Sequence, residues 1–307
     1  MYVAVVGSIS VSATKKHKLA DQEEPQAKKV KLMDNNNNDT TGLPLGLTWD
    51  GTNYSCAYDA LFIILYNIWA ENPRSWSKKF KSLDNQYLTM LVNGFKQILH
   101  QQKSFETVRD AVRSKLHSAY PARFPKGHVG ISVVALAVEL FRTARTVASS
   151  QLLCTQCQYE EPEISDQLGY VLYANRNLTG STSRWVQNLY QLQQQKCPEC
   201  LAEMDQPIFY NKPPCVLVLE YAQTHIRTSH RLKIKLDEDD VELHLRGIVY
   251  HGRFHFTSQF ISRKGDIWYH DGRETGKTCI YNGSLTSTQE SELKKCRNRD
   301  LVLALYA

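Results

Sequence analysis

The sequence predicts an α+β protein in which a helical half is followed by an antiparallel sheet. Between about residues 56 and 147, apolar residues recur at helical spacing. After Leu152 the period changes, and short apolar or alternating runs typical of strands follow one another to the end of the chain. Two Cys-x-x-Cys pairs stand where the pattern changes. Helices that precede a run of strands, instead of alternating with them, indicate an α+β architecture.

The composition excludes several classes of protein. A hydrophobic fraction of 42% in 307 residues is ordinary for a globular chain and too high for a fully disordered one. No stretch approaches the ~18 consecutive apolar residues of a membrane span, so we expect a soluble protein without a membrane partner. The short N-terminal apolar run precedes its basic residues, which is the reverse of a secretory signal. In a chain that is not exported, eight cysteines indicate metal ligands, a nucleophile or buried thiols rather than disulfides.

Residues 1–42 are expected to form a disordered tail, because they lack periodicity and end in a polar asparagine run. Two basic clusters in this tail, Lys15–Lys18 and Lys28–Lys31, resemble a bipartite nuclear-import signal, which makes an import receptor a candidate partner. The alternative is a solvated leader, since six lysines stand against five acidic residues there. We expect the protein in the nucleus, the cytoplasm or both, and not outside the cell.

Residues 43–307 are long enough for one large domain, or for one domain with a substantial insertion. Its first predicted helix, Cys56–Trp69, is apolar almost all round, which indicates burial on every side. Helical spacing of apolar residues predicts a second helix over Asp84–Gln102. Two shorter helices are predicted over 105–118 and 130–147.

The second half is predicted to supply the sheet. Its runs are rich in β-branched and aromatic residues and are bounded by turn-forming residues. The predicted strands are Pro213–Tyr221, Arg231–Leu236, Val241–Tyr250, His255–Ile261, Asp266–His270 and Leu301–Tyr306.

The two Cys-x-x-Cys pairs, Cys154 with Cys157 and Cys197 with Cys200, predict a structural metal site. Two residues between thiols allow both sulfurs to face one ion, and two such turns complete a tetrahedral site. Thiolate ligands and tetrahedral geometry favour one zinc ion, with iron second. Four thiolates close the coordination shell, so this zinc is not expected to be catalytic. A redox pair or unrelated buried thiols are the alternatives. The 39 residues between the pairs, at 158–196, form a polar, glutamine-rich segment that is expected to fold into extended hairpins.

Cys56 is a candidate nucleophile. It follows the polar, turn-forming segment 48–55 and begins the buried helix, where the positive end of the helix dipole favours a thiolate. Ser55 or Asn53 could cap this helix. A buried, inert structural cysteine is the alternative interpretation.

A partner for this thiol is found near the other end of the sequence. In the strand that follows Tyr250, alternation places His251 and His255 on the polar face, opposite the aromatic residues. Asp271 follows at the end of the next predicted strand. A cysteine, a histidine and an aspartate that orients the histidine form the arrangement of an acyl-transfer cysteine hydrolase. A histidine in a strand is also common as a structural residue.

These motifs, in this order, resemble the ubiquitin-specific proteases, the papain-like deubiquitinases that consist of a thumb, a palm and zinc-bearing fingers. The nucleophile box of that family matches Cys56-Ala-Tyr-Asp-Ala-Leu, and its two Cys-x-x-Cys pairs match those described above. Its late box, Gly-His-Tyr-x-Ala-Tyr followed by Trp-Tyr-x-x-Asp, is matched by His255-Phe-Thr-Ser-Gln-Phe and then, with one residue fewer before the acid, by Trp268-Tyr-His-Asp271. Pro213–Glu220 and Leu301–Tyr306 resemble the strand after the fingers and the closing strand.

The resemblance implies a papain-like cysteine protease fold, with a helical thumb packed on an antiparallel-sheet palm and a zinc-binding fingers insertion at about 148–212. It implies a catalytic domain at 43–307 that hydrolyses the bond after the C-terminal glycine of ubiquitin or a ubiquitin-like modifier. Cys56 would be the nucleophile, His255 the base and Asp271 the residue that orients the base. Ubiquitin or a ubiquitin-like modifier, with its conjugates, is the implied partner.

The nucleophile box also departs from the family pattern. Asp59 and Ala57 stand where the family has an asparagine and an aromatic residue. Asp50 and Gly51 occupy the positions where the family has an asparagine or glutamine that helps to form the oxyanion hole. Asn53 is nearer to the nucleophile and is a candidate substitute, as are backbone N–H groups at the start of the helix.

Two other classes of function remain open. The altered oxyanion positions favour a catalytically silent ubiquitin-binding module on the same fold. The basic tail and the net charge of +6 favour a nuclear zinc-ribbon protein that contacts nucleic acid. Against the latter, residues 43–307 carry 31 Lys and Arg against 26 Asp and Glu, with no basic stripe interleaved with aromatic residues. Nucleic acid is therefore not an expected partner. An OTU-type protease fits the spacing less well and does not explain the zinc pairs.

Overall fold

The structure, a computed structural model, describes residues 43–167, 169–173, 179–188, 190–221, 226–234, 236 and 240–307. The tail at 1–42 and its two lysine clusters lie outside the described residues, so its disorder and its import role stay predictions. The described part of the chain folds into helices and two sheets of four and nine strands, which confirms the α+β class. Among the described residues, no helix has the length and apolar content needed to span a bilayer.

The helical half contains five helices where the sequence predicts four. They are α1 (Cys56–Glu71), α2 (Pro73–Lys81), α3 (Gln86–Leu99), α4 (Phe105–Ala119) and α5 (Val133–Phe141). The unexpected helix, α2, buries only three of its nine residues, so its apolar period is too short to be recognised in the sequence. It starts where it does because the Asn72 side chain accepts a hydrogen bond from the Ser75 N–H at 3.1 Å and a proline occupies its first position.

The helix predicted over 130–147 is shorter than expected, because α5 ends at Phe141. The Asn85 side chain donates to the carbonyl oxygens of Glu139, at 2.7 Å, and Arg142, at 2.9 Å. Arg142 has an extended backbone and pairs with Gly169 in an isolated bridge. These bonds occupy groups that a continuing helix would need for its own hydrogen bonds.

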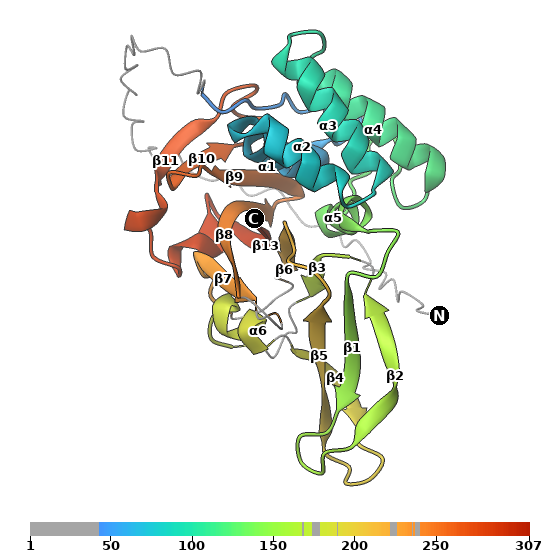
Figure 1. Cartoon of the computed structure of the whole chain (residues 1–307). Helices are drawn as coiled ribbons and strands as arrows, with labels where there is room; N and C mark the ends of the chain where they lie inside the picture. The colour runs from blue at the N-terminus through green and yellow to red at the C-terminus, as the bar shows by residue number, and fades with distance from the viewer. Residues whose placement is uncertain are drawn as a thin grey trace, which may run out of the picture. The chain divides into compact units, whose positions relative to one another are not determined.

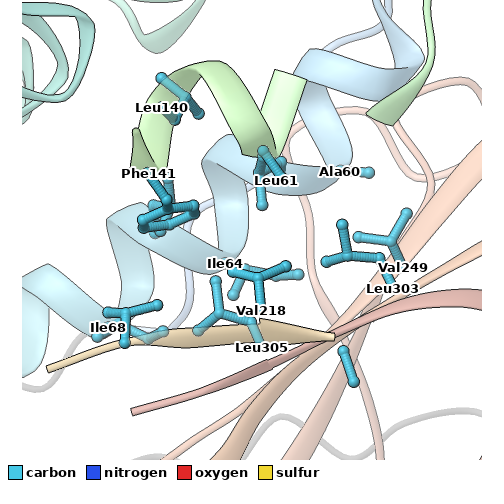
Figure 2. Close-up of a cluster of buried hydrophobic side chains, with 14 of the residues drawn as sticks. Ala60, Leu61, Ile64, Ile68, Leu140, Phe141, Val218, Val249, Leu303 and Leu305 are labelled. Carbon is cyan, nitrogen blue, oxygen red and sulfur yellow. The ribbon is translucent and has the colours of Figure 1, made fainter. Parts of the chain in front are cut away.

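Helix α1 is buried on every side, as predicted: all of its residues from Cys56 to Trp69 are buried. It lies between α5 and the nine-stranded sheet (Figure 2). The labelled side chains of this layer come from α1 (Ala60, Leu61, Ile64, Ile68), α5 (Leu140, Phe141) and the strands (Val218, Val249, Leu303, Leu305). Each fully buried leucine or isoleucine contributes about 1.5–3 kcal/mol by leaving water, so this layer fixes the position of α1 on the sheet.

The four-stranded sheet is antiparallel, with strand order β2-β1-β5-β4. Its strands are β1 (Ala148–Leu153), β2 (Glu160–Gln167), β4 (Tyr190–Lys196) and β5 (Glu203–Tyr210). Figure 1 shows them as long neighbouring strands. The extended hairpins expected at 158–196 are present in part, since that segment also contains a short strand, β3 (Val171–Tyr173), and a helix, α6 (Thr182–Asn188).

The nine-stranded sheet follows the order β11-β10-β9-β8-β13-β6-β3, with β12 paired to β13 and β7 to β8. Its remaining strands are β6 (Leu217–Glu220), β7 (Arg231–Ile234), β8 (Val241–Gly252), β9 (His255–Ile261), β10 (Asp266–His270), β11 (Ile280–Ser284), β12 (Lys295–Cys296) and β13 (Arg299–Tyr306). The strand predicted from Pro213 begins only at Leu217, because the two prolines there lack N–H donors for a ladder.

One edge of this sheet is not antiparallel: β3 pairs with β6 in parallel. Parallel neighbours need a long crossover connection. Residues 174–216, which include two strands of the four-stranded sheet, β4 and β5, provide it. The predicted antiparallel sheet thus carries one parallel pair at this edge, where the chain returns from the insertion.

The contact of α1 with the sheet depends on the absence of a side chain at Gly247 in β8. A Cβ atom there would lie 2.4 Å from Cγ2 of Ile64. We therefore expect Gly247→Ala to lower the free energy of unfolding by about 1–3 kcal/mol through overpacking. Urea denaturation measures the change. Gly130→Ala is the matched control, since a Cβ there meets nothing within 4 Å. Equal stability of the two variants would contradict this account of the packing.

Candidate active site and metal centre

Cys56 is the first residue of α1 and is 7% exposed. The expected side-chain cap is absent: Ser55 occupies the N-cap position with helical backbone angles, and its hydroxyl makes no capping bond. That hydroxyl instead donates to Asp59 at 2.7 Å. Among the described contacts, Asn53 does not cap the helix either, because its amide is bonded within the preceding loop and to Gly127. The N–H groups of the first turn of α1 therefore have no intrahelical acceptor.

His255 is the first residue of β9, directly after a tight turn from β8. Gly252 pairs with His255 across the turn, and the two residues between them, Arg253 and Phe254, have φ values of 53° and 59°. Two successive residues with positive φ are the mark of a type I′ turn, whose twist matches that of the strands it joins. The turn thereby fixes the direction in which His255 enters the sheet.

The His255 ring is paired with Asp271, the residue that follows β10. Its Nε2 atom lies 2.7 Å from Oδ1 of Asp271, and the two residues are only 6% and 1% exposed. Asp271 also accepts hydrogen bonds from the Arg273 N–H at 3.0 Å and from Nη2 of Arg299 at 3.3 Å. These bonds leave the carboxylate little freedom to rotate away from the ring.

The electrostatics of the pair favour a charged histidine. Burial acts to lower the pKa of His255, but hydrogen bonds and charge from Asp271 and Cys56 outweigh it and raise the pKa to about 9. Burial acts in the opposite sense on Asp271, yet the hydrogen bond and charge of His255 hold the pKa of that carboxyl below its usual value. The structure thus brings together Cys56, His255 and Asp271, from α1, β9 and the end of β10.

The other histidines near this group have different surroundings. His251, on the same predicted face as His255, packs its ring 4.5 Å from that of Phe256, and burial together with the charge of His255 lowers its pKa. The Leu47 N–H donates to Nε2 of His270 at 3.2 Å. Of the two histidines that the strand pattern singles out, only His255 reaches the carboxylate in the described contacts.

The loop before the nucleophile is organised by Asp50. One carboxylate oxygen accepts from the N–H groups of Thr52, at 3.0 Å, and Asn53, at 3.2 Å, and the other accepts from Nδ2 of Asn53 at 2.9 Å. Burial raises the pKa of Asp50, and these hydrogen bonds lower it more, so the pKa lies below its usual value. An ionised carboxylate only accepts hydrogen bonds, so Asp50 orders the loop and does not donate to an oxyanion. The oxyanion role of Asn53 stays a prediction.

Two aromatic residues of the same loop were not singled out in the sequence. The ring of Trp49 meets the His255 ring edge-on at 6.0 Å. Tyr54 stacks on Trp49 at 6.3 Å and on His128 at 5.4 Å. Their adjacency to Cys56 in the segment TWDGTNYS is the only signal that the sequence offers, and it does not reveal the stacking. Of the two, only Trp49 contacts the His255 ring in the described structure.

The four cysteines form a second, separate centre at the ends of the hairpins of the four-stranded sheet. The sulfur atoms of Cys154, Cys157, Cys197 and Cys200 all lie within 4.8 Å of one another. Two of the sulfur–sulfur distances, Cys154 to Cys200 and Cys157 to Cys197, are 3.5 Å. A tetrahedral site with Zn–S bonds of about 2.3 Å requires separations of about 3.8 Å. The cluster fits one structural zinc ion, as the spacing predicts.

The two turns that carry these cysteines have the same backbone geometry. The Cys154 N–H donates to the Tyr159 carbonyl and the Cys197 N–H to the Ala202 carbonyl, both at 2.8 Å. The residue after each pair, Gln158 or Leu201, has a positive φ, of 66° and 63°. The repetition makes two equivalent knuckles. In Figure 1 the loops that join β1 to β2 and β4 to β5 lie side by side at one end of the sheet.

No protein-family model and no curated protein matches the sequence. Among solved structures, the chain is similar to a chain of the SAGA Ubp8/Sgf11/Sus1/Sgf73 DUB module bound to ubiquitin aldehyde. The TM-score is 0.53 at 15% identity, and the match covers 86% of this chain and 69% of that chain. The fold is that of a ubiquitin-specific protease. A SAGA DUB module bound to monoubiquitin (TM-score 0.46, 15% identity, 86% and 68% covered) and a yeast SAGA DUB module (0.46, 16%, 86% and 68%) are also similar.

The parts of a ubiquitin-specific protease fold can now be assigned to this chain. Helices α1–α5 form the thumb, the nine-stranded sheet forms the palm, and the four-stranded sheet with its cysteine cluster forms the fingers. The fold implied by the resemblance is therefore confirmed. Cys56 lies at the start of a thumb helix, and His255 and Asp271 lie on the palm.

The zinc centre makes a direct prediction about composition and stability. Purified protein is expected to contain one zinc per chain, measured by inductively coupled plasma mass spectrometry. Cys197→Ala removes a ligand, so we expect loss of the zinc and a lower Tm. Cys215→Ala is the control, because Cys215 lies outside the cluster, and it is expected to keep the zinc. A zinc-free wild-type protein, or an unchanged Tm in Cys197→Ala, would contradict the assignment.

Proposed function

We propose that this chain is a cysteine-type deubiquitinase that hydrolyses the peptide or isopeptide bond after the C-terminal glycine of ubiquitin or a ubiquitin-like modifier. The grouping of a helix-terminal Cys56 with His255, which in turn lies 2.7 Å from Asp271, carries the proposal. It occurs on a fold shared with a module that was solved bound to ubiquitin aldehyde. Fold alone does not establish activity, so the chemistry is argued from the residues.

The first step is activation of the thiol. Asp271 engages Nε2 of His255, which leaves Nδ1 to exchange a proton with Cys56. Transfer of the thiol proton to the ring yields a thiolate and an imidazolium. A His255 pKa of about 9 favours the imidazolium at neutral pH, and the buried Asp271 carboxylate stabilises its charge. The start of α1 favours the negative thiolate.

The second step is transfer of the acyl group. The thiolate attacks the carbonyl carbon of the terminal glycine, and negative charge develops on the carbonyl oxygen near the N–H groups at the start of α1. The amide bond breaks as His255 donates its proton to the leaving lysine amine, which leaves a thioester on Cys56. Water, deprotonated by His255, then attacks the thioester, releasing the modifier with a free carboxylate and restoring the thiol. The zinc ion takes no part, because its four cysteine ligands leave no open position.

A catalytically silent ubiquitin-binding module on the same fold is the competing proposal. The bonding of the Asn53 amide to Asp50 favours it, since this side chain does not point freely at the thiol. A ubiquitin probe with a C-terminal electrophile separates the two, because only a reactive thiolate becomes covalently labelled. Parallel probes made with ubiquitin and with SUMO identify the modifier.

We expect Cys56→Ala to abolish hydrolysis of a ubiquitin C-terminal fluorogenic amide, with at least a ~10³-fold loss in kcat, because the nucleophile is gone. We expect His255→Ala to lower kcat by at least ~10²-fold, because thiol activation and protonation of the leaving group both need this ring.

The controls for these variants come from the same chain. Cys279 is 7% exposed, like Cys56, and has no described hydrogen bond. Cys279→Ala and His251→Ala are expected to retain most of the activity. Turnover by Cys56→Ala, or a loss in His251→Ala equal to that in His255→Ala, would overturn the assignment of roles.

The His255–Asp271 pair also predicts a pH dependence. The imidazolium is lost as the pH rises through about 9, so kcat/KM is expected to fall on the alkaline side near that pH. Asp271→Asn removes the charge that raises the His255 pKa, so we expect the alkaline limb to move to lower pH by at least about one unit. Hydrolysis rates at subsaturating substrate, measured between about pH 6 and pH 10, give the position of the alkaline limb in each protein.

Glu274→Gln is the control for Asp271→Asn, because Glu274 is an exposed neighbour that pairs with Arg297. Its alkaline limb is expected to stay in place. An unmoved limb in Asp271→Asn would show that this carboxylate does not set the His255 pKa.

A further inference from the structure

Helix α4 holds the loop that precedes Cys56 through two arginines one helical turn apart. Arg113 donates to the backbone carbonyl of Asn53 and lies 3.5 Å from the Asp50 carboxylate, on the outer part of the loop. Arg109 contacts the first residue of the loop, where its Nη1 atom donates to the Thr48 carbonyl at 2.8 Å. The i, i+4 spacing places both side chains on one face of the helix.

The charge of Arg109 is buried and is paired with Asp59, the residue one turn into α1. Nη1 lies 2.9 Å from Oδ1 of Asp59, and both side chains are 3% exposed. Burial raises the pKa of Asp59 and the Arg109 charge lowers it, with a net value of about 7. Burying such a pair costs several kcal/mol in desolvation, and apolar residues of similar size are often as stable. Stability alone is therefore a weak reason for the pair.

Ser55 connects the ion pair to the loop. Its hydroxyl accepts from the Asp50 N–H at 2.8 Å and from Nη1 of Arg109 at 3.3 Å, and it donates to Asp59. Its own N–H donates to the Asp50 carbonyl at 3.2 Å. Within the loop so closed, Tyr54 has a φ of 45°, in the left-handed region that an aromatic residue rarely adopts. Such a residue persists only where its surroundings hold it.

We infer that Arg109, held in place by Asp59, is a positioning residue. It fixes the loop at 48–55, and thereby orients the N–H groups at the start of α1 toward the substrate carbonyl oxygen on which negative charge develops. This inference rests on the proposed hydrolase function. Asp50 and Gly51 carry no side-chain donor at the positions where the resembling family has an amide. The nearest side-chain amide, Asn53, is bonded to Asp50, so charge stabilisation in this proposal comes from backbone donors, whose direction depends on the loop.

A second ion pair provides the matched control. Arg246 contacts Glu71 at 2.6 Å, and its side chain is also buried. Glu71 is the last residue of α1 and Cys56 the first, so the control pair lies roughly 22 Å from the thiol along the helix. Loss of that pair is expected to affect stability without affecting the loop.

The test uses the double variant Asp59→Leu/Arg109→Met, which replaces the pair with apolar side chains and is expected to fold. We expect kcat for a ubiquitin C-terminal amide to fall by about 10- to 100-fold with little change in KM, because donors to the transition state are misplaced. Alkylation of Cys56 by iodoacetamide generates no oxyanion, so its rate, followed by mass spectrometry, is expected to stay within about twofold of wild type. Arg109→Lys keeps the charge but not the planar fork, and we expect an intermediate kcat.

Two further measurements complete the experiment. Amide hydrogen exchange in residues 48–58 is expected to accelerate in the double variant and not in Glu71→Gln. Glu71→Gln is expected to lower Tm and to keep wild-type kcat. If the double variant is folded with wild-type kcat, if its exchange is unchanged, or if alkylation slows as much as kcat, the inference is wrong.

Failure of the proposed function is distinguishable from failure of this inference. If wild-type protein hydrolyses neither ubiquitin nor SUMO substrates, the hydrolase proposal is wrong, and so is the inferred contribution of Arg109 to kcat. The exchange data then decide separately whether Arg109 and Asp59 hold the loop.

Discussion

The packing of α1 against the palm is the contact on which the rest of the structure depends. Gly247 lets Ile64 approach the backbone of β8, so the helix lies directly on the sheet. The same helix is covered by α5 on another side, and its residues are buried through Trp69. A helix held this firmly has a fixed N-terminus, and that N-terminus is Cys56. The core therefore fixes where α1 lies on the sheet, while the bonds from Arg109 and Arg113 hold the loop that leads into its first turn.

The palm fixes the other half of the site by strand register. The two-residue turn at Arg253 and Phe254 makes His255 the first residue of β9, and the pairing of His270 with Ser258 places Asp271 just past the end of β10. A shift of one residue in either strand would turn one of the two side chains to the opposite face. The 2.7 Å distance between His255 and Asp271 is thus a consequence of register. The loop at 48–55 completes the site by covering the ring with Trp49.

The features that the sequence predicts best are the ones with local causes. The zinc cysteines follow from spacing, because each knuckle is a single turn, and the burial of α1 follows from its apolar composition. The pairing of Arg109 with Asp59 joins charged residues on two helices, and a lone arginine in an amphipathic helix normally predicts a solvated face. The parallel pairing of β3 with β6 and the end of α5 at Phe141 depend on contacts across distant segments. Side-chain patterns within one segment do not encode such contacts.

The four-cysteine cluster and the Cys56–His255–Asp271 group lie in separate parts of the fold, and different forces hold each of them. Cys154, Cys197 and Met204 form a small buried cluster of their own, apart from the continuous core under the thumb and palm. Among the side chains that the structure describes there, this cluster is small, so a zinc ion bound by the four cysteines would contribute strongly to the stability of that end of the fingers. The palm and thumb need no such support, since they share a large core. Metal ligation would therefore fix the geometry of the end of the fingers, whereas core packing fixes the relative positions of Cys56, His255 and Asp271.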